Sequence, residues 1–132
     1  MKYLLDTSVF LWAIGPSELL SKETQGLLAG TRHGLYLSAA SSWEIAIKSS
    51  IKKLPLPEPA AQYIPNMLLI AGIQSLPITH VHALAVADLP LYHTDPFDRL
   101  LVAQAQHESM VLLTTDHNIL KYDVETLWCA RT

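Results

Sequence analysis

The chain of 132 residues has the length of one domain, and half of its residues are hydrophobic. It can therefore bury a substantial core, which excludes intrinsic disorder. Nine Lys and Arg residues against twelve Asp and Glu residues give a net charge of −3. This balance argues against a protein that coats nucleic acid non-specifically, but it leaves room for a nuclease with a small basic patch.

Two further features concern the compartment and the membrane. The single cysteine, Cys129, excludes an internal disulfide and a zinc site of paired cysteines, and we expect a cytoplasmic protein. Asp6 interrupts the N-terminal apolar run too early for a signal peptide. The segment 59–87 lacks Asp, Glu, Lys and Arg, but Pro65 and Pro77 break it. We interpret it as helix, short strand and helix inside the core, and we expect no membrane partner.

The predicted elements alternate between strands and helices. In the first half they are a strand at 2–5, a polar turn at 6–8, a helix at 9–14, a helix after Ser21 that closes at Gly30, a strand at 35–37 and a helix that begins near Ser38 or Ser41. After a stiff connector at 54–59 they are a helix to 70, a strand at 73–76, helices at 79–87 and 95–107, a strand at 110–113, a short helical piece and a strand near 125–127. This alternation predicts an α/β fold with a parallel sheet and right-handed crossovers.

Four acidic residues are predicted to meet at one edge of this sheet. Asp6 directly follows the first strand, and Asp116 directly follows a later one. Both would lie at the carboxyl edge, where ligands bind to open α/β sheets. Glu44 and Asp98 lie in the first turns of their helices. Clustered like charges repel unless a cation neutralises them, and a cluster of oxygen ligands favours Mg²⁺ or Mn²⁺.

Each of the four acids also has a purely structural explanation. Asp6 could hydrogen-bond within its own turn, and Asp98 would interact favourably with the helix dipole. Asp116 could cap the piece that follows it, and Glu44 could pair with Lys48 one turn later. Taken singly these explanations suffice, but they do not account for the expected convergence of all four.

Two further groups we interpret as structural. Asp95 is an ordinary N-cap, with Pro96 at the first helical position. A cation held by carboxylate oxygens requires no histidine, so the six histidines are expected to be structural or surface residues. The histidine that could instead take part in the site is His93, because it lies two residues before Asp95.

Four segments carry a recognisable pattern. They are MKYLLDTS at 1–8, SSWEIAIK at 41–48, HTDPFDRLLVAQA at 93–105 and TTD at 114–116. In this order and spacing the whole chain resembles a PIN-domain ribonuclease and, more narrowly, a VapC-type toxin of a bacterial type II toxin–antitoxin pair. The resemblance implies a single PIN domain over residues 1–132. It also implies a PIN-like α/β fold of three layers (α/β/α) around a central, mainly parallel sheet of about five short strands.

The resemblance also implies an activity. The acidic positions of the family map onto Asp6, Glu44, Asp98 and Asp116, and the implied reaction is Mg²⁺- or Mn²⁺-dependent hydrolysis of RNA phosphodiester bonds. We expect Asp6 and Asp98 to be direct metal ligands. Asp116 would bind a second metal ion or hold the waters of the first. Glu44 would orient the attacking water.

RNA and protein partners follow from the same resemblance. We expect Lys48 and Lys52 to lie one and two turns beyond Glu44 on the same helical face and to contact phosphates, together with Arg99, which follows Asp98. The alternative is that the lysines form a solvated stripe and that Arg99 makes a salt bridge. The family also implies a cognate antitoxin, whose C-terminal segment blocks the acidic site, and a homodimer.

Two other functions compete with the nuclease. A phosphoacceptor domain would need paired acids after the first strand and a lysine after the last, but Asp6 is single and no lysine follows Asp116 before Lys121. A non-catalytic PIN-like scaffold that binds RNA or protein would not need all four acids.

Overall fold

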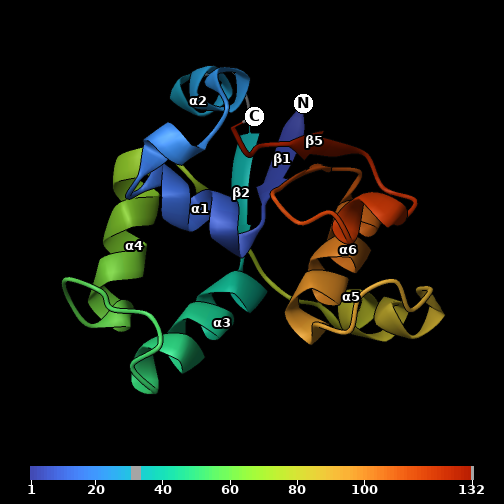
Figure 1. The fold of residues 1–132 in the computed structure, drawn as a ribbon. Coiled ribbons are helices and arrows are strands. Elements are labelled where there is room, and N and C mark those ends of the chain that lie inside the picture. The colour runs from blue at the N-terminus through green and yellow to red at the C-terminus, as the bar shows by residue number, and fades with distance from the viewer. Residues whose placement is uncertain (31–33, 132) are drawn as a thin grey trace.

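The strand β1 (Lys2–Leu5) lies at the centre of the sheet. The computed structural model describes residues 1–30 and 34–131, and within them five strands form one sheet in the order β3-β2-β1-β4-β5 (Figure 1). All four pairings are parallel, which confirms the predicted sheet. The other strands are β2 (Gly34–Ser38) and β4 (Val111–Thr114), which flank β1, and the edge strands β3 (Gln74–Leu76) and β5 (Thr126–Trp128).

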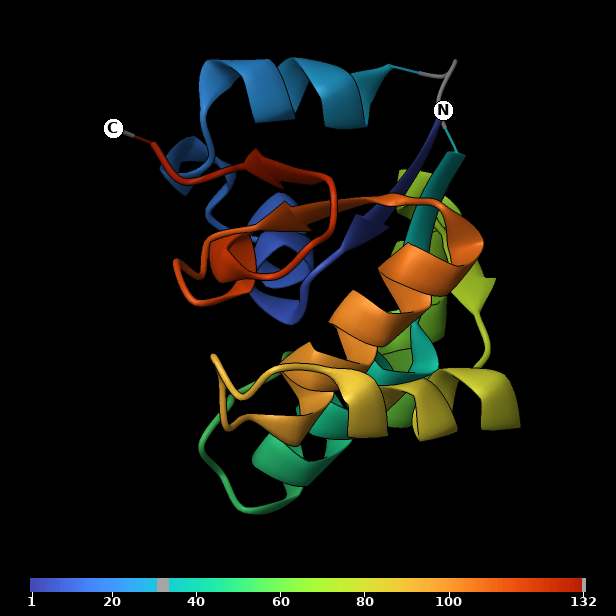
Figure 2. The ribbon, with the colours of Figure 1, turned by 90° about the vertical axis from the view of Figure 1, so that its right-hand side faces the viewer.

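Helices cover both faces of this sheet. They are α1 (Thr7–Ala13), α2 (Lys22–Ala29), α3 (Ala39–Ser50), α4 (Ala60–Ala71), α5 (His80–Ala85) and α6 (Pro96–Glu108), with the short 3₁₀ turns η1 (Ser17–Leu19), η2 (Val86–Asp88) and η3 (Ile119–Lys121). Figure 1 shows α1 and α4 on one side of the sheet and α5 and α6 on the other. Figure 2 faces the layer formed by α5 and α6. The predicted three-layer fold is therefore confirmed.

The alternation of side chains along β1 fills two cores. Leu5 packs with Phe10 and Ile64 in the core beneath α1 and α4. Leu4 points to the opposite face and packs with Leu101 in the core beneath α6. Because both faces are covered, the strand is a continuous apolar run instead of an alternating one.

Two helix starts refine the predictions. The polar turn expected at 6–8 is wrong, since α1 already begins at Thr7. Asp6 has an extended backbone and its Oδ1 accepts the N–H of Val9 at 2.7 Å, so it caps the helix. Of the two candidate caps for α3, the structure uses Ser38, whose hydroxyl accepts the N–H of Ala40 at 3.0 Å.

The uncharged segment 59–87 forms α4, β3, α5 and η2, in the predicted order. The helix predicted to run to residue 70 is α4, and Pro65 lies inside it, where it removes one backbone hydrogen bond. Gly72 ends α4 with a left-handed backbone (φ 68°). In the described part of the chain, no helix is long and apolar enough to cross a membrane.

The fold brings the chemical groups to the carboxyl ends of β1 and β4. These strands are neighbours, and the N–H of Asp6 donates to Leu113 O at 2.9 Å, which continues their pairing past the end of β1. The helix α3 packs against both α1 and α6. The starts of three helices therefore lie around one edge of the sheet.

Candidate active site

Asp6 is the most buried carboxylate of the site, with 3% of its surface exposed. Its Oδ1 caps α1, and its Oδ2 accepts the N–H of Thr115 at 3.2 Å, just after β4. Burial raises the pKa of Asp6 to about 6, against the effect of hydrogen bonds from Thr114, Val9 and Thr115, and the charge of Asp116 raises it further. The structural explanation of a local cap is correct, but it leaves a desolvated carboxylate between two strands.

Glu44 connects α3 to α1 through Thr7. The Thr7 hydroxyl donates to Glu44 Oε1 at 2.7 Å and lies 3.0 Å from Ser41 Oγ. Lys48 Nζ donates to Glu44 Oε2 at 2.6 Å, as the structural alternative predicted. The carboxylate of Glu44 is therefore held on both oxygens. The hydrogen bond with Glu44 raises the pKa of Lys48, and the charges of Glu44, Asp95 and Asp98 add to this increase.

Asp98 projects from the first turn of α6. Its neighbour Asp95 caps this helix, because Asp95 Oδ1 accepts the N–H groups of Phe97 (2.8 Å) and Asp98 (3.1 Å). The structural interpretation of Asp95 thus agrees with the geometry. Burial raises the pKa of Asp98 to about 7, and the charges of Asp95, Asp6 and Glu44 act in the same direction. These effects show that the predicted carboxylates lie within electrostatic range of one another.

Asp116 and Asp98 share one histidine. His93 Nε2 lies 2.7 Å from Asp116 Oδ2 and 3.1 Å from Asp98 Oδ2. The other oxygen of Asp116 accepts the N–H of Asn118 at 2.8 Å. Burial lowers the pKa of His93, but the hydrogen bond with Asp116 and the charges of Asp116, Asp98 and Asp95 outweigh it, and the net direction is upward.

Four carboxylates from separate segments of the chain thus gather at one edge of the sheet. Their negative charge exceeds what His93 and Lys48 can balance. Burial is the main cause of the raised pKa values of Asp6 and Asp98, and the charges of neighbouring acids add to it. Carboxylate oxygens are the ligands that hard divalent cations prefer. The set of oxygen donors therefore suits a hard cation such as Mg²⁺ or Mn²⁺. Asp98 and Asp116, together with His93, have ligand atoms within 4.8 Å of one another, and Asp6 lies outside that group.

Lys52 and Arg99, two of the residues predicted to contact RNA, have other surroundings than expected. Lys52 does not share a helical face with Glu44, because α3 ends at Ser50 and Lys52 has a left-handed backbone (φ 61°). The guanidinium of Arg99 donates instead to four groups of the chain. They are Pro90 O (2.9 Å), Val86 O (3.1 Å), Leu89 O (3.3 Å) and Tyr122 Oη (3.2 Å). Arg99 is neither a free phosphate ligand nor the salt-bridge partner of the alternative interpretation.

Two residues, Thr7 and His93, contact the acidic cluster although little in the sequence indicated it. Thr7 follows Asp6 and was placed in a turn, whereas its hydroxyl orients Glu44 from 37 positions away. His93 was mentioned only as a possible exception, and its short distance from Asp95 was the sole local signal. Its second partner, Asp116, lies 23 positions further along the chain, beyond the range of any helical or strand period.

The comparisons with known proteins agree with this geometry. The model of the PIN domain family matches residues 3–125, which is nearly the whole chain. The matched residues include most of β1, the whole of β2, β3 and β4, and the four acids gathered at one edge of the sheet. The chain belongs to the PIN-domain family.

A curated relative and several solved structures resemble the chain. "Ribonuclease VapC16" from Mycobacterium tuberculosis (strain ATCC 25618 / H37Rv) is 43% identical over 60 residues, a segment that spans 46% of this chain and 43% of that protein. VapBC2 from Rickettsia felis, solved with a DNA fragment from its promoter, has a chain with a TM-score of 0.73 at 16% identity, covering 97% of this chain and 99% of that one. FitAcB from Neisseria gonorrhoeae has a TM-score of 0.66 at 20% identity, with 96% of each chain covered. At these identities the structural likeness is one of fold.

Proposed function

We propose that this protein is a Mg²⁺- or Mn²⁺-dependent ribonuclease that hydrolyses RNA phosphodiester bonds, and that it is the toxin of a type II toxin–antitoxin module. The observation that carries the proposal is the gathering of Asp6, Glu44, Asp98 and Asp116 at one sheet edge, with the pKa values of Asp6 and Asp98 raised. The partial match to a protein named as a ribonuclease supports the same reaction. Such a role belongs to the cytoplasm, where RNA is accessible.

The four carboxylates would have two different roles, cation binding and orientation of the attacking water, according to their surroundings. Asp6, Asp98 and Asp116 would hold the cation. Asp98 and Asp116 each place Oδ2 beside His93 Nε2, and Asp6 lies between the ends of β1 and β4, close enough for its charge to act on Asp98. A bound divalent cation would lower the pKa of a water and stabilise the charge of the phosphate and of the leaving oxygen. Glu44 would orient the attacking water, because Thr7 and Lys48 hold its carboxylate in one position.

Lys48 is the RNA contact that we retain. Its side chain is half exposed while its Nζ sits against Glu44, so it borders both the acids and the solvent. A phosphate placed there would gain a positive charge next to the cluster. Contacts of this kind position a strand without reading its sequence.

A cognate antitoxin is the proposed protein partner. A cleft of about 750 Å³ opens between α2 and the C-terminal end of α4, and apolar residues such as Leu28, Leu35 and Leu69 line part of it. An extended apolar segment of an antitoxin could occupy this cleft.

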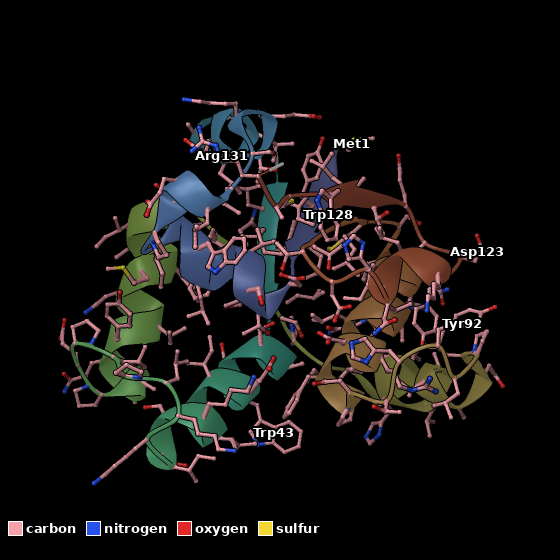
Figure 3. The ribbon with its side chains drawn as sticks, in the orientation of Figure 1. Met1, Trp43, Tyr92, Asp123, Trp128 and Arg131 are labelled. Carbon is pink, nitrogen blue, oxygen red and sulfur yellow. The ribbon has the colours of Figure 1, made fainter. Side chains whose placement is uncertain are left out.

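A homodimer is the second proposed assembly. Trp43 and Ile47 on α3 and Ile51 just after its end form an exposed apolar stripe, and 59% of the Trp43 surface is exposed. Figure 3 shows the side chain of Trp43 beside α3. Exposed apolar surface at helical spacing is typical of an interface. Light scattering of the purified protein, compared with that of Trp43→Ser, tests this assembly.

The activity is tested with purified protein and bacterial RNA. We expect cleavage in Mg²⁺ or Mn²⁺, none in EDTA, and recovery when the cation is restored. Cleavage that persists in chelator would refute the metal-dependent mechanism. Binding without cleavage would favour the scaffold, and an acyl phosphate on an aspartate would favour the phosphoacceptor.

The biological role is tested in cells. Expression of the chain alone in a bacterium should arrest growth through RNA cleavage, and co-expression of the antitoxin from the neighbouring reading frame should relieve the arrest. Normal growth with strong expression of folded protein would count against a toxin, while the cleavage assay would still judge the nuclease.

A further inference from the structure

His93 is held so that one particular nitrogen carries a proton. Its Nδ1 accepts the backbone N–H of Asp95 at 3.2 Å, so the neutral ring has its proton on Nε2. The charged ring also carries a proton on Nε2. In both forms Nε2 is therefore a hydrogen-bond donor and has no lone pair to offer a metal ion.

The same Nε2 faces the two carboxylates that arrive from different elements. It lies 2.7 Å from Asp116 Oδ2, after β4, and 3.1 Å from Asp98 Oδ2, in the first turn of α6. Asp116 Oδ1 is held by the N–H of Asn118, so the hydrogen bond to His93 determines the rotation of this carboxylate. The hydrogen bond runs to Asp116, and Asp98 lies at ion-pair distance from the same nitrogen, so the imidazole stands between two acids that would otherwise repel.

The loop that carries His93 is itself braced. The N–H of His93 donates to the hydroxyl of the buried Tyr122 at 3.0 Å. The same hydroxyl accepts from Arg99 Nη1, whose guanidinium also binds the carbonyls of residues 86, 89 and 90. The ring of Tyr92, the residue before His93, packs edge-to-face on the ring of Tyr122 with their centroids 5.1 Å apart. Arg99 and Tyr122 therefore keep His93 in place.

We propose that His93 is a positioning residue, which holds Asp98 and Asp116 at the spacing that a divalent cation requires and does not itself coordinate the cation. Three groups with ligand atoms close together, His93, Asp98 and Asp116, would also fit a site in which the imidazole is a ligand. The hydrogen bond from Asp95 to Nδ1 favours positioning over coordination. The inference rests on the metal site of the proposed function, but it concerns binding and not turnover.

The test measures Mn²⁺ binding to the full chain by electron paramagnetic resonance. His93→Phe keeps a planar ring and removes the donor, and we expect it to weaken Mn²⁺ binding about 10- to 100-fold, as for other residues that orient metal ligands. His93→Gln places an amide N–H at a similar reach and should restore affinity to within about threefold of the wild type. His107→Phe, on the exposed far end of α6, is the matched control and should bind as the wild type does.

A second measurement separates positioning from coordination. Spin-echo spectra of the wild type with Mn²⁺ should show no nitrogen of a directly coordinated imidazole. Such a nitrogen signal, lost in His93→Phe and His93→Gln, would overturn the proposal. So would wild-type affinity in His93→Phe, or a wild-type protein that does not bind Mn²⁺. If His93→Phe does not fold, the wild-type spectrum and His93→Gln still decide.

The outcome is independent of turnover. A wild-type protein that binds Mn²⁺ as described but does not cut RNA would refute the proposed ribonuclease and leave the role of His93 intact. A protein that cuts RNA with a coordinated His93 would refute the positioning role alone.

Discussion

The two ends of α6 both join histidines to carboxylates, and they differ in their charge balance. At the N-terminal end, one histidine, His93, faces two acids, Asp98 and Asp116. At the C-terminal end, one acid, Glu108, lies 2.7 Å from His82 Nε2 and 3.9 Å from His107 Nε2. The first end has an excess of negative charge, and the second does not.

The acids respond in opposite directions. Burial and neighbouring acids raise the pKa of Asp98 to about 7. The hydrogen bond with His82 lowers the pKa of Glu108. Both histidines are held alike, because His82 Nδ1 accepts the N–H of Thr79 at 3.1 Å, so Nε2 of His82 is also a donor. The cluster of His82, His107 and Glu108 has atoms close enough for a metal, but its geometry is that of an ion pair.

The comparison teaches that proximity of ligand atoms does not define a metal site. What distinguishes the N-terminal end is uncompensated charge that folding tolerates and a cation would relieve. The following predictions test this difference, from the largest expected effect to the smallest.

Removing one charge at the N-terminal end should abolish activity. Asp98→Asn is nearly isosteric, and we expect RNA cleavage to fall by more than about 100-fold, because the lost group is a proposed direct ligand of the metal. Glu108→Gln makes the same chemical change at the other end and should leave the cleavage rate unchanged. If the cleavage rate on the same RNA falls equally in Asp98→Asn and Glu108→Gln, the two ends of α6 do not differ in function.

Added cation should stabilise the wild type. At 100 times the dissociation constant, a ligand of the native state contributes about 2.7 kcal/mol. Asp6→Asn should lose most of this gain. Its metal-free stability should stay the same or rise, because removal of the buried charge offsets the hydrogen bond that Thr115 N–H loses, while the amide oxygen still caps α1. Melting curves with and without MgCl₂ provide the measurement. A wild type whose melting temperature ignores Mg²⁺ would contradict the cluster.

The metal-free protein should lose stability as the pH rises. The folded pKa values of Asp6 (about 6) and Asp98 (about 7) lie above the ordinary value of 3.8. At a pH between 3.8 and the raised pKa, the folded state therefore binds more protons at these two groups than the unfolded state does. Their contribution to stability is thus present below pH 4 and lost by pH 7, and for Asp98 we expect about 1–3 kcal/mol. Denaturant titrations in EDTA at pH 5 and 7.5 should show a smaller decrease in Asp98→Asn. An unchanged decrease would be evidence against the raised pKa of Asp98.

Glu108 should show the opposite pH dependence with a smaller effect. Its lowered pKa means that its ion pair stabilises the protein above the unfolded pKa and is lost as the pH falls through the folded value. Because the side chain is one-third exposed, Glu108→Gln should cost less than about 1 kcal/mol at pH 7. The difference from the wild type should narrow in acid. A difference that widens in acid would contradict the pairing.

The local features were predictable because their causes are local. Ser21, Asp95 and Gly72 act on the adjacent turns of their own helices, and the structure uses each as expected. The start of α1 was missed because an Asp-Thr-Ser run is equally typical of a polar turn. Only the packing of α1 against β1 decides that the chain continues as a helix there.

The sequence by itself determined the order of strands and helices, and thereby which acids follow parallel strands and begin helices. A hydrophobic period and a cap act within a few residues, so these features can be read from short segments. Only the tertiary structure decided that His93 lies between Asp98 and Asp116, and that the guanidinium of Arg99 binds backbone carbonyls. Those contacts depend on how a loop folds back over α6, and no local period records the distance between segments that far apart in the chain.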